Sequence, residues 1–293
     1  MSGGEIAIAA ERSVGDNLIE LEVHSPALGR AASVLLLTPR GWAPGGTGRW
    51  PALYLLHGGD ATPRTMLERT DIAARGPADG VLTVLPDGGR AGFYTDWVGP
   101  DSLGSVPAWS RFHLDEVLGL VRSRYGAGPV AAAGISMGGY GAVMYAARRP
   151  GTFAAVASYS GMLHTTRPGM PSLIRGYLRS VGERVGSMWG ARLGGRDRWA
   201  ANNPYRLADR LAATPLYLSW GDGTRVAGDP PAPGDRLLER LIGPTSAALA
   251  GRLAALGHPA RTSLGPGTHD YPPWQRELDR SWPFLLDALR AAG

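Results

Sequence analysis

The stretch VAAAGISMGGYGAVMYAAR, residues 130–148, indicates the fold of this chain more strongly than any other. An apolar run leads into Ser136, and a helical pattern rich in Ala and Gly leaves it. Gly134 and Gly138 complete the pattern G-x-S-x-G, in which a serine lies on a strained strand-to-helix turn above a sheet. The alternative is a glycine-rich turn with an incidental serine. The flanking strand and helix favour a nucleophilic Ser136. The amino terminus of the helix that follows it would stabilise developing negative charge.

Strands and helices alternate on both sides of this stretch. Short apolar runs bounded by Gly, Pro and Asp predict strands at 18–23, 33–38, 52–56, 81–85, 130–135, 154–158 and 216–220. Helical patterns occur at 64–75, 110–124, 137–148, 235–256 and 273–292. The alternation predicts an α/β fold with a mostly parallel central sheet and helices on both faces. The first two strands have no helix between them, so we expect them to form an antiparallel edge.

The chain of 293 residues is expected to form a single domain, 1–293. Residues 163–203 are irregular and rich in Arg, Gly, Met and Trp, and we expect them to form a helical insertion over the active site. The loops are expected at 41–51, as a surface turn, and at 221–234, after a predicted strand.

Composition excludes several kinds of chemistry. The chain has no Cys, and all 30 of its basic residues are Arg. Without Cys there is no disulfide, thiolate nucleophile or Cys-based zinc site, and without Lys there is no Schiff base or P-loop lysine. Covalent catalysis must therefore use an oxygen nucleophile or a histidine.

An acyl-transfer site also needs two backbone donors and a base. Met137 follows the nucleophile, and Gly59 lies in the His-Gly-Gly loop after the 52–56 strand, so their N–H groups are the expected oxyanion donors. His269 comes late in the chain, before the last helix, and is the expected base. His258 follows a helix in a Leu-Gly-His-Pro turn, which is more typical of a cap.

The acid that orients His269 should lie on the loop after the penultimate strand. Asp229 and Asp222 both lie there, and Asp235 and Glu239 follow. We favour Asp229, because Asp222 comes directly after the strand and could cap the turn instead.

Cofactors and macromolecular partners are not indicated. There is no HExxH motif and no His–Asp cluster at metal-ligand spacing, so no metal and no cofactor are expected. The net charge is +5, but the arginines are dispersed, so a nucleic-acid partner is not expected. No apolar run is long enough for a membrane span, and the first residues lack a signal-peptide pattern. The expected location is cytoplasmic, or secreted if a leader has been removed.

The chain resembles the antigen-85-type mycolyltransferases and the related esterase D branch of the α/β hydrolases. The resemblance runs from about residue 21 to residue 289. It rests on SPALGR (25–30), YLLHG (54–58), FYTDW (93–97), GISMG (134–138), SMWG (187–190), NP (203–204), GDGT (221–224) and GTHDY (267–271). It implies an α/β-hydrolase fold, with Ser136 as nucleophile, His269 as base, and Gly59 and Met137 at the oxyanion hole.

The resemblance also implies a substrate site, with some departures from the family. It places His57, Asp60, Trp97 and Tyr271 there, although the mycolyltransferases have Asp and Arg at the first two positions and usually Trp at the last. Their catalytic Glu falls at Ala227 by an ungapped count from Gly221, which implies an acid displaced to a residue such as Asp229. Their disulfide after the Asp-Trp motif is absent here.

The predicted function is hydrolysis of a small-molecule or lipid carboxylic ester through an acyl-enzyme, with Ser136, His269 and Asp229 as the catalytic triad. One alternative is an acyltransferase that passes the acyl group to a sugar or another alcohol. A second alternative, from a different class, is a non-catalytic relative that binds carbohydrate or protein. The intact serine and histidine argue against the second.

Overall fold

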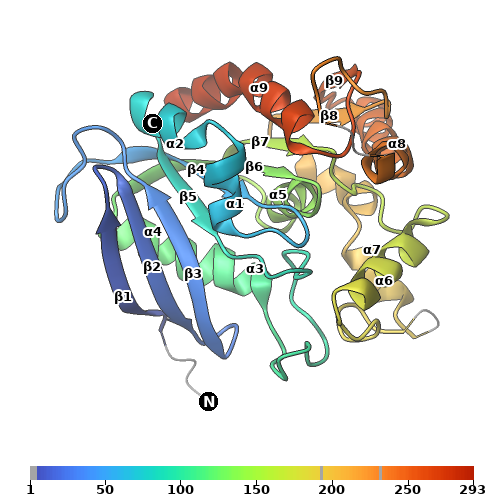
Figure 1. The fold of residues 1–293 in the computed structure, drawn as a ribbon, viewed down its shortest axis with the longest axis horizontal. Coiled ribbons are helices and arrows are strands. Elements are labelled where there is room, and N and C mark those ends of the chain that lie inside the picture. The colour runs from blue at the N-terminus through green and yellow to red at the C-terminus, as the bar shows by residue number, and fades with distance from the viewer. Residues whose placement is uncertain (1–4, 192–193, 231–232) are drawn as a thin grey trace.

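A sheet of nine strands runs through the centre of the molecule, which we describe from a computed structural model (Figure 1). The structure describes residues 5–191, 194–230 and 233–293. The strand order is β1-β2-β3-β5-β4-β6-β7-β8-β9. The strands are β1 (Ala7–Val14), β2 (Leu18–Ser25), β3 (Arg30–Leu37), β4 (Trp50–Leu56), β5 (Leu82–Pro86), β6 (Ala127–Ile135), β7 (Phe153–Tyr159), β8 (Leu216–Gly221) and β9 (Arg261–Gly265).

The sheet is parallel from β5 to β9 and antiparallel at its amino-terminal edge. Strands β1, β2 and β3 pair antiparallel, and β3 pairs antiparallel with β5. The other neighbouring pairs are parallel. The antiparallel edge predicted from the sequence is confirmed, and β1 extends it. The sequence does not mark β1 because most of its side chains are exposed, which leaves no continuous apolar run.

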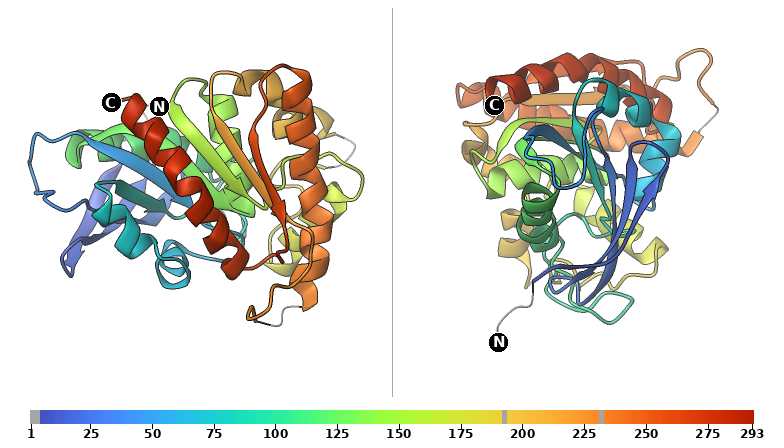
Figure 2. Two further views of the ribbon diagram at one scale, coloured as in Figure 1. Left: turned by 90° about the horizontal axis from the view of Figure 1, so that it is seen from above. Right: turned by 90° about the vertical axis from the view of Figure 1, so that its left-hand side faces the viewer.

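Helices cover both faces of the sheet, as predicted (Figures 1 and 2). They are α1 (Pro63–Arg69), α2 (Ile72–Ala78), α3 (Trp109–Arg111), η1 (Phe112–Val117), α4 (Leu118–Arg124), α5 (Met137–Arg148), α6 (Met170–Ser180), α7 (Arg196–Ala201), η2 (Pro204–Leu211), α8 (Pro233–Ala255) and α9 (Tyr271–Ala291). Figure 2 shows α9 crossing one face of the sheet. Helices α1 and α2 lie on that same face, and α4, α5 and α8 pack on the other.

Strand β4 shows how the central strands hold these layers together. Leu53 and Leu55 belong to the apolar cluster under α9, whereas Tyr54 and Leu56 belong to the cluster under α4 and α5. Successive side chains of a strand point to opposite faces, so a strand buried on both faces is apolar throughout. This explains the continuous apolar runs from residue 52 onward.

Two predicted elements differ in detail. The helix predicted at 64–75 is divided into α1 and α2, because Thr70 takes an extended conformation and its hydroxyl donates to the Met66 carbonyl. The turn predicted at 41–51 ends where β4 begins, at Trp50. The region 163–203 contains α6 and α7.

None of the helices in the described ranges is both long enough and apolar enough to cross a membrane.

Candidate active site

Ser136 lies on the turn between β6 and α5, with φ 51° and ψ −115°. This is a strained conformation for a residue with a side chain. The neighbouring glycines allow it. A Cβ on Gly134 would overlap the carbonyl of Gly138, and a Cβ on Gly138 would overlap the Leu56 carbonyl of the adjacent strand. Glycine is therefore required at both positions for the chain to turn this sharply.

His269 reaches the serine from the loop between β9 and α9. Its Nε2 lies 2.8 Å from the Ser136 Oγ, and its Nδ1 lies 2.6 Å from Glu239 Oε2. The Trp274 ring packs edge-on against the imidazole, with centroids 4.9 Å apart. The predicted pairing of Ser136 with His269 is therefore present, and the third member of the chain is Glu239.

The Glu239 carboxylate is fully buried on α8 and is satisfied on both oxygens. Its Oε1 accepts hydrogen bonds from the Gly221 N–H (2.7 Å) and from the Ser160 hydroxyl (2.8 Å). The Ser160 Oγ in turn accepts from Trp274 Nε1 at 3.0 Å. Hydrogen bonds of this kind fix the orientation of a buried carboxyl. These contacts to Oε1 leave Oε2 of Glu239 facing His269 Nδ1.

The placement of Asp229 beside His269 is wrong. Its carboxylate instead makes two hydrogen bonds to the Arg276 guanidinium of α9, at 2.9 and 2.8 Å. Arg276 also holds the pKa of the Asp229 carboxyl below its ordinary value. Asp222 caps its own turn, since its Oδ1 accepts from the Thr224 N–H at 2.6 Å.

The sequence of α8 contains a pattern that identifies Glu239, although Glu239 lies outside the loop in which the acid was expected. Along α8, the buried residues Glu239, Ile242, Leu249 and Leu253 recur at helical spacing. A glutamate on the buried stripe of an amphipathic helix needs a partner in the core, because burial of an unpaired charge is costly. The ungapped count failed because the acid follows the whole 221–234 loop and lies on the helix after it.

Gly59 and Met137, the expected oxyanion donors, line the same cavity as Ser136. Met137 begins α5, and Gly58 lies so close that a Cβ added to it would be 3.6 Å from the Ser136 Cβ. Within the described ranges, the N–H groups of Gly59 and Met137 donate to no backbone carbonyl of a turn, loop or cap. The first N–H groups of a helix have no intrahelical acceptor, so they are available to a bound oxyanion.

A cavity of about 780 Å³ opens at Ser136. Its lining includes Gly59, Met137 and His269, and one of its walls is formed by α6 through Ser172, Leu173, Ile174, Gly176, Tyr177 and Ser180. The Tyr177 hydroxyl donates to the Arg90 carbonyl, and a Cβ on Gly59 would lie 2.5 Å from the Tyr177 Oη. The insertion therefore covers the active site through α6.

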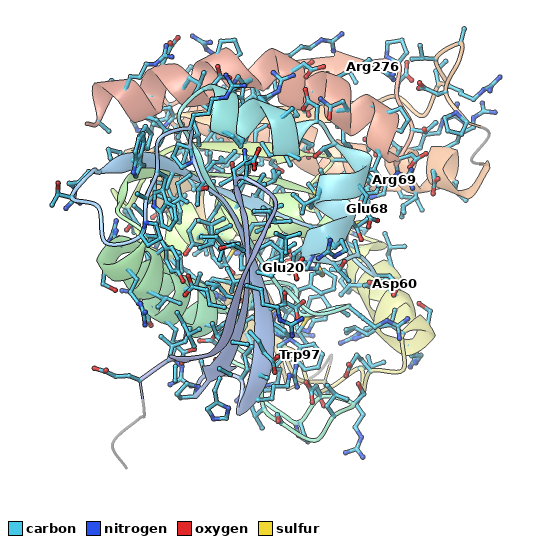
Figure 3. All side chains as sticks on the ribbon, turned by 60° about the vertical axis from the view of Figure 1, so that its left-hand side comes forward. Glu20, Asp60, Glu68, Arg69, Trp97 and Arg276 are labelled. Atoms are coloured by element: carbon cyan, nitrogen blue, oxygen red, sulfur yellow. The ribbon has the colours of Figure 1, made fainter. Side chains whose placement is uncertain are left out.

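Two of the four predicted substrate-site residues line this cavity. Asp60 and Tyr271 do, and Asp60 also pairs with Arg90 (Nε to Oδ1, 2.7 Å). Figure 3 shows Asp60 between α1 and α6, and Arg276 on α9. His57 and Trp97 are both buried and do not line the cavity.

His57 and Trp97 support loops instead. His57 Nε2 accepts from the Gly88 N–H at 2.8 Å, so its Nδ1 is left to donate to the Gly58 carbonyl at 2.8 Å. Trp97 Nε1 donates to the Gly92 carbonyl at 3.1 Å. His57 thus shapes the loop that carries Gly59.

Among the described residues, no group of three or more His, Asp or Glu side chains is arranged to hold a metal ion. A serine hydroxyl is hydrogen-bonded to an imidazole and the imidazole to a buried carboxylate, and Gly59 and Met137 line the same cavity as the serine. This arrangement is suited to acyl transfer through a covalent intermediate.

Sequence and structure comparisons relate the chain to known proteins. Residues 25–285 match the sequence profile of the family described as "Putative esterase". The chain is 31% identical over 273 residues to Esterase MT1326 of Mycobacterium tuberculosis (strain CDC 1551 / Oshkosh); the match covers 87% of the chain and 56% of that relative. The chain therefore spans little more than half the length of that relative.

Two further similarities cover nearly the whole chain. It is 30% identical to the diacylglycerol acyltransferase/mycolyltransferase Ag85C of Mycobacterium avium, over 98% of this chain and 82% of that protein. The crystal structure of MPT51 (FbpC1) of Mycobacterium tuberculosis superposes with a TM-score of 0.76 at 24% identity, covering 96% of this chain and 99% of that one. That likeness supports the α/β-hydrolase fold.

Proposed function

The chain belongs to this esterase family of α/β hydrolases, and from that premise we propose that it hydrolyses carboxylic esters through an acyl-enzyme formed on Ser136. The observation that carries the proposal is the unbroken hydrogen-bonded chain from Ser136 through His269 to Glu239. Because all three hydrogen-bonded side chains are present, we do not favour the alternative of a relative that only binds carbohydrate or protein.

The first half-reaction forms the acyl-enzyme. The Ser136 Oγ attacks the ester carbonyl carbon while His269 Nε2 takes its proton. The N–H groups of Gly59 and Met137 stabilise the negative charge on the former carbonyl oxygen. Collapse of the tetrahedral intermediate breaks the bond to the alcohol, which leaves with the proton from His269.

The second half-reaction restores the serine. His269 takes a proton from water, the resulting hydroxide equivalent attacks the acyl carbon, and the carboxylic acid leaves as Ser136 recovers its proton. Glu239 accepts from His269 Nδ1 throughout, so it selects the tautomer with a basic Nε2 and stabilises the imidazolium. Burial of Glu239 among three donors keeps that carboxylate in one orientation.

A specific observation also favours a second candidate, acyl transfer to an alcohol. The mycolyltransferase relative matches 98% of this chain, and the acyl-enzyme would be common to both reactions. The two reactions differ only in whether water or an alcohol attacks the acyl carbon. Adding glycerol or trehalose to the assay and analysing the products for new acyl esters would distinguish them.

The decisive test uses a fluorophosphonate label and a short p-nitrophenyl ester. We expect the label on Ser136, and loss of hydrolysis by a factor of about 10⁴–10⁶ in Ser136→Ala. Ser102→Ala is the matched control, since Ser102 hydrogen-bonds Glu183 on an exposed loop outside the cavity lining. Unlabelled Ser136, together with full activity of Ser136→Ala, would refute the proposal.

A further inference from the structure

A second hollow lies behind the wall of the catalytic cavity. It measures about 370 Å³ and is lined by Thr166, Pro171, Arg175, Arg196, Trp199, Ala200 and Arg206. These residues come from α6, from α7, from η2 and from the segment before α6. Figure 1 shows α6 and α7 on the same side of the molecule. The hollow therefore joins successive parts of the 163–203 insertion to η2.

Helix α6 separates this hollow from the catalytic cavity. Pro171 and Arg175, which are four residues apart, line the hollow. Ser172, Gly176 and Tyr177 line the cavity. Residues at i and i+4 share one face of a helix, so α6 presents two different faces to two different spaces. A ligand in the hollow would contact the same helix as a substrate acyl group without occupying its site.

The polar side chains that line the hollow can all donate hydrogen bonds, and none of the described lining residues carries a carboxylate. Three are guanidinium groups, which have no acceptor function. The Thr166 hydroxyl accepts from Asn203 Nδ2 at 2.7 Å, which leaves its own hydrogen to donate. Trp199 is only 5% exposed, and its Nε1 has no acceptor among the described residues. A wall of cationic donors with a hydroxyl and an indole N–H matches an anionic ligand rich in acceptors.

Two of the charges in the hollow have no ion-pair partner in the part of the chain that the structure describes. Within the described ranges, neither Arg196 nor Arg206 lies within ion-pair distance of a carboxylate. The Arg175 guanidinium stacks over the Trp199 ring, 5.0 Å from its centroid. Arg206 also contributes, after burial and Arg167, to a lowered pKa of the nearby His164. The local potential is therefore positive.

We propose that this hollow binds a phosphate-type oxyanion. Guanidinium groups recognise phosphate oxygens through paired N–H donors, and three of them converge here with a hydroxyl. The chemistry fits a free phosphate, the phosphate of a small phosphorylated compound, or a phospholipid headgroup. Binding would offset the charges of Arg196 and Arg206 and tie α6, α7 and η2 together.

The test compares wild type with the double variant Arg196→Gln/Arg206→Gln, and with Arg210→Gln as the matched control. All three arginines are exposed, and Arg210 lies on η2 outside the hollow. Inorganic phosphate is titrated at constant ionic strength while the thermal unfolding temperature is measured, since a ligand of the native state raises it. We expect saturable stabilisation of wild type and of Arg210→Gln, and binding weakened at least about tenfold in the double variant.

A second arm identifies the source of the phosphate. Vesicles of phosphatidylcholine, with and without phosphatidic acid, are sedimented with each protein. Binding that needs both phosphatidic acid and the two arginines supports the site with a lipid headgroup as occupant, even if inorganic phosphate binds weakly. The proposal is overturned if neither phosphate nor phosphatidic acid distinguishes the double variant from Arg210→Gln. Hydrolysis of a p-nitrophenyl ester without phosphate should be equal in all three proteins, so this result is independent of the proposed function.

Discussion

At the scale of single residues, the identity of the triad acid has the largest consequence. Glu239 is the buried carboxylate that contacts His269, whereas Asp229 forms an ion pair with Arg276 at the surface side of α9. Both are acidic residues that follow β8, so chain order alone does not separate them. Their hydrogen bonds do.

Replacing each carboxylate by its amide tests this assignment. We expect Glu239→Gln to lower kcat by roughly 10³–10⁴, because the amide no longer fixes the tautomer of His269 or stabilises the imidazolium. Asp229→Asn should change kcat by less than about threefold, since it weakens only a partly exposed ion pair. The measurement is steady-state hydrolysis of a p-nitrophenyl ester. The opposite order of the two variants would restore Asp229 as the acid.

At the scale of elements, the turn into α5 depends on the absence of side chains at its glycines. We expect Gly138→Ala to lower the free energy of unfolding by about 3 kcal/mol or more, because the added Cβ would overlap the Leu56 carbonyl of β4. Urea denaturation of the purified variant measures this. Activity should fall with it, since the same turn positions Ser136.

Gly119→Ala is the matched control. Gly119 is exposed on α4, and a Cβ there would meet no atom within 4 Å. Alanine is the better helix former, so this variant should be stabilised by about 0.5–1 kcal/mol. Equal effects of the two substitutions would contradict the steric account of the turn.

Helix α6 supplies the element-scale prediction about specificity. Gly176 lines the catalytic cavity, and a Cβ there would meet no atom within 4 Å, so Gly176→Phe should fold and fill part of the space. We expect kcat/KM for a p-nitrophenyl ester with a long acyl chain to fall about tenfold or more relative to the acetate ester. Arg179→Phe, on the same helix but outside the cavity lining, should leave that ratio unchanged. A ratio that is equal in the two variants would place the acyl chain elsewhere.

At the scale of the whole molecule, one buried histidine ties stability to pH. His113 is fully buried: its Nε2 lies 2.8 Å from the Asp87 carbonyl, and its Nδ1 contacts the Tyr145 hydroxyl. Burial lowers the pKa of His113 to about 3. Below the ordinary pKa of about 6.5, the unfolded chain takes up a proton that the folded chain does not, so stability falls as pH falls.

The expected loss from this group between pH 7 and pH 5 is about 2 kcal/mol. Urea denaturation at both pH values measures it in wild type and in His113→Gln, which removes the titrating group but keeps a polar side chain. Other groups contribute equally to both proteins. The fall in stability should therefore be steeper in wild type, and parallel curves would show that His113 does not govern this range.

The sequence by itself predicted strands β2 to β8 and the main helices between and after them, and it located Ser136, His269 and the Gly59 loop. These features depend on local patterns: continuous apolar runs, glycine spacing, and the position of a residue after a strand. Strand β1 was not predicted, because most of its side chains are exposed and it has no continuous apolar run.

Only the tertiary structure decided which carboxylate meets His269 and which arginines share a hollow. Glu239 and His269 are separated by 30 residues, and Arg175, Arg196 and Arg206 belong to three different elements. Such pairings depend on how helices pack over the ends of the strands. Hydrogen bonds and charge interactions act over a few ångströms in space, and distance along the chain does not report them.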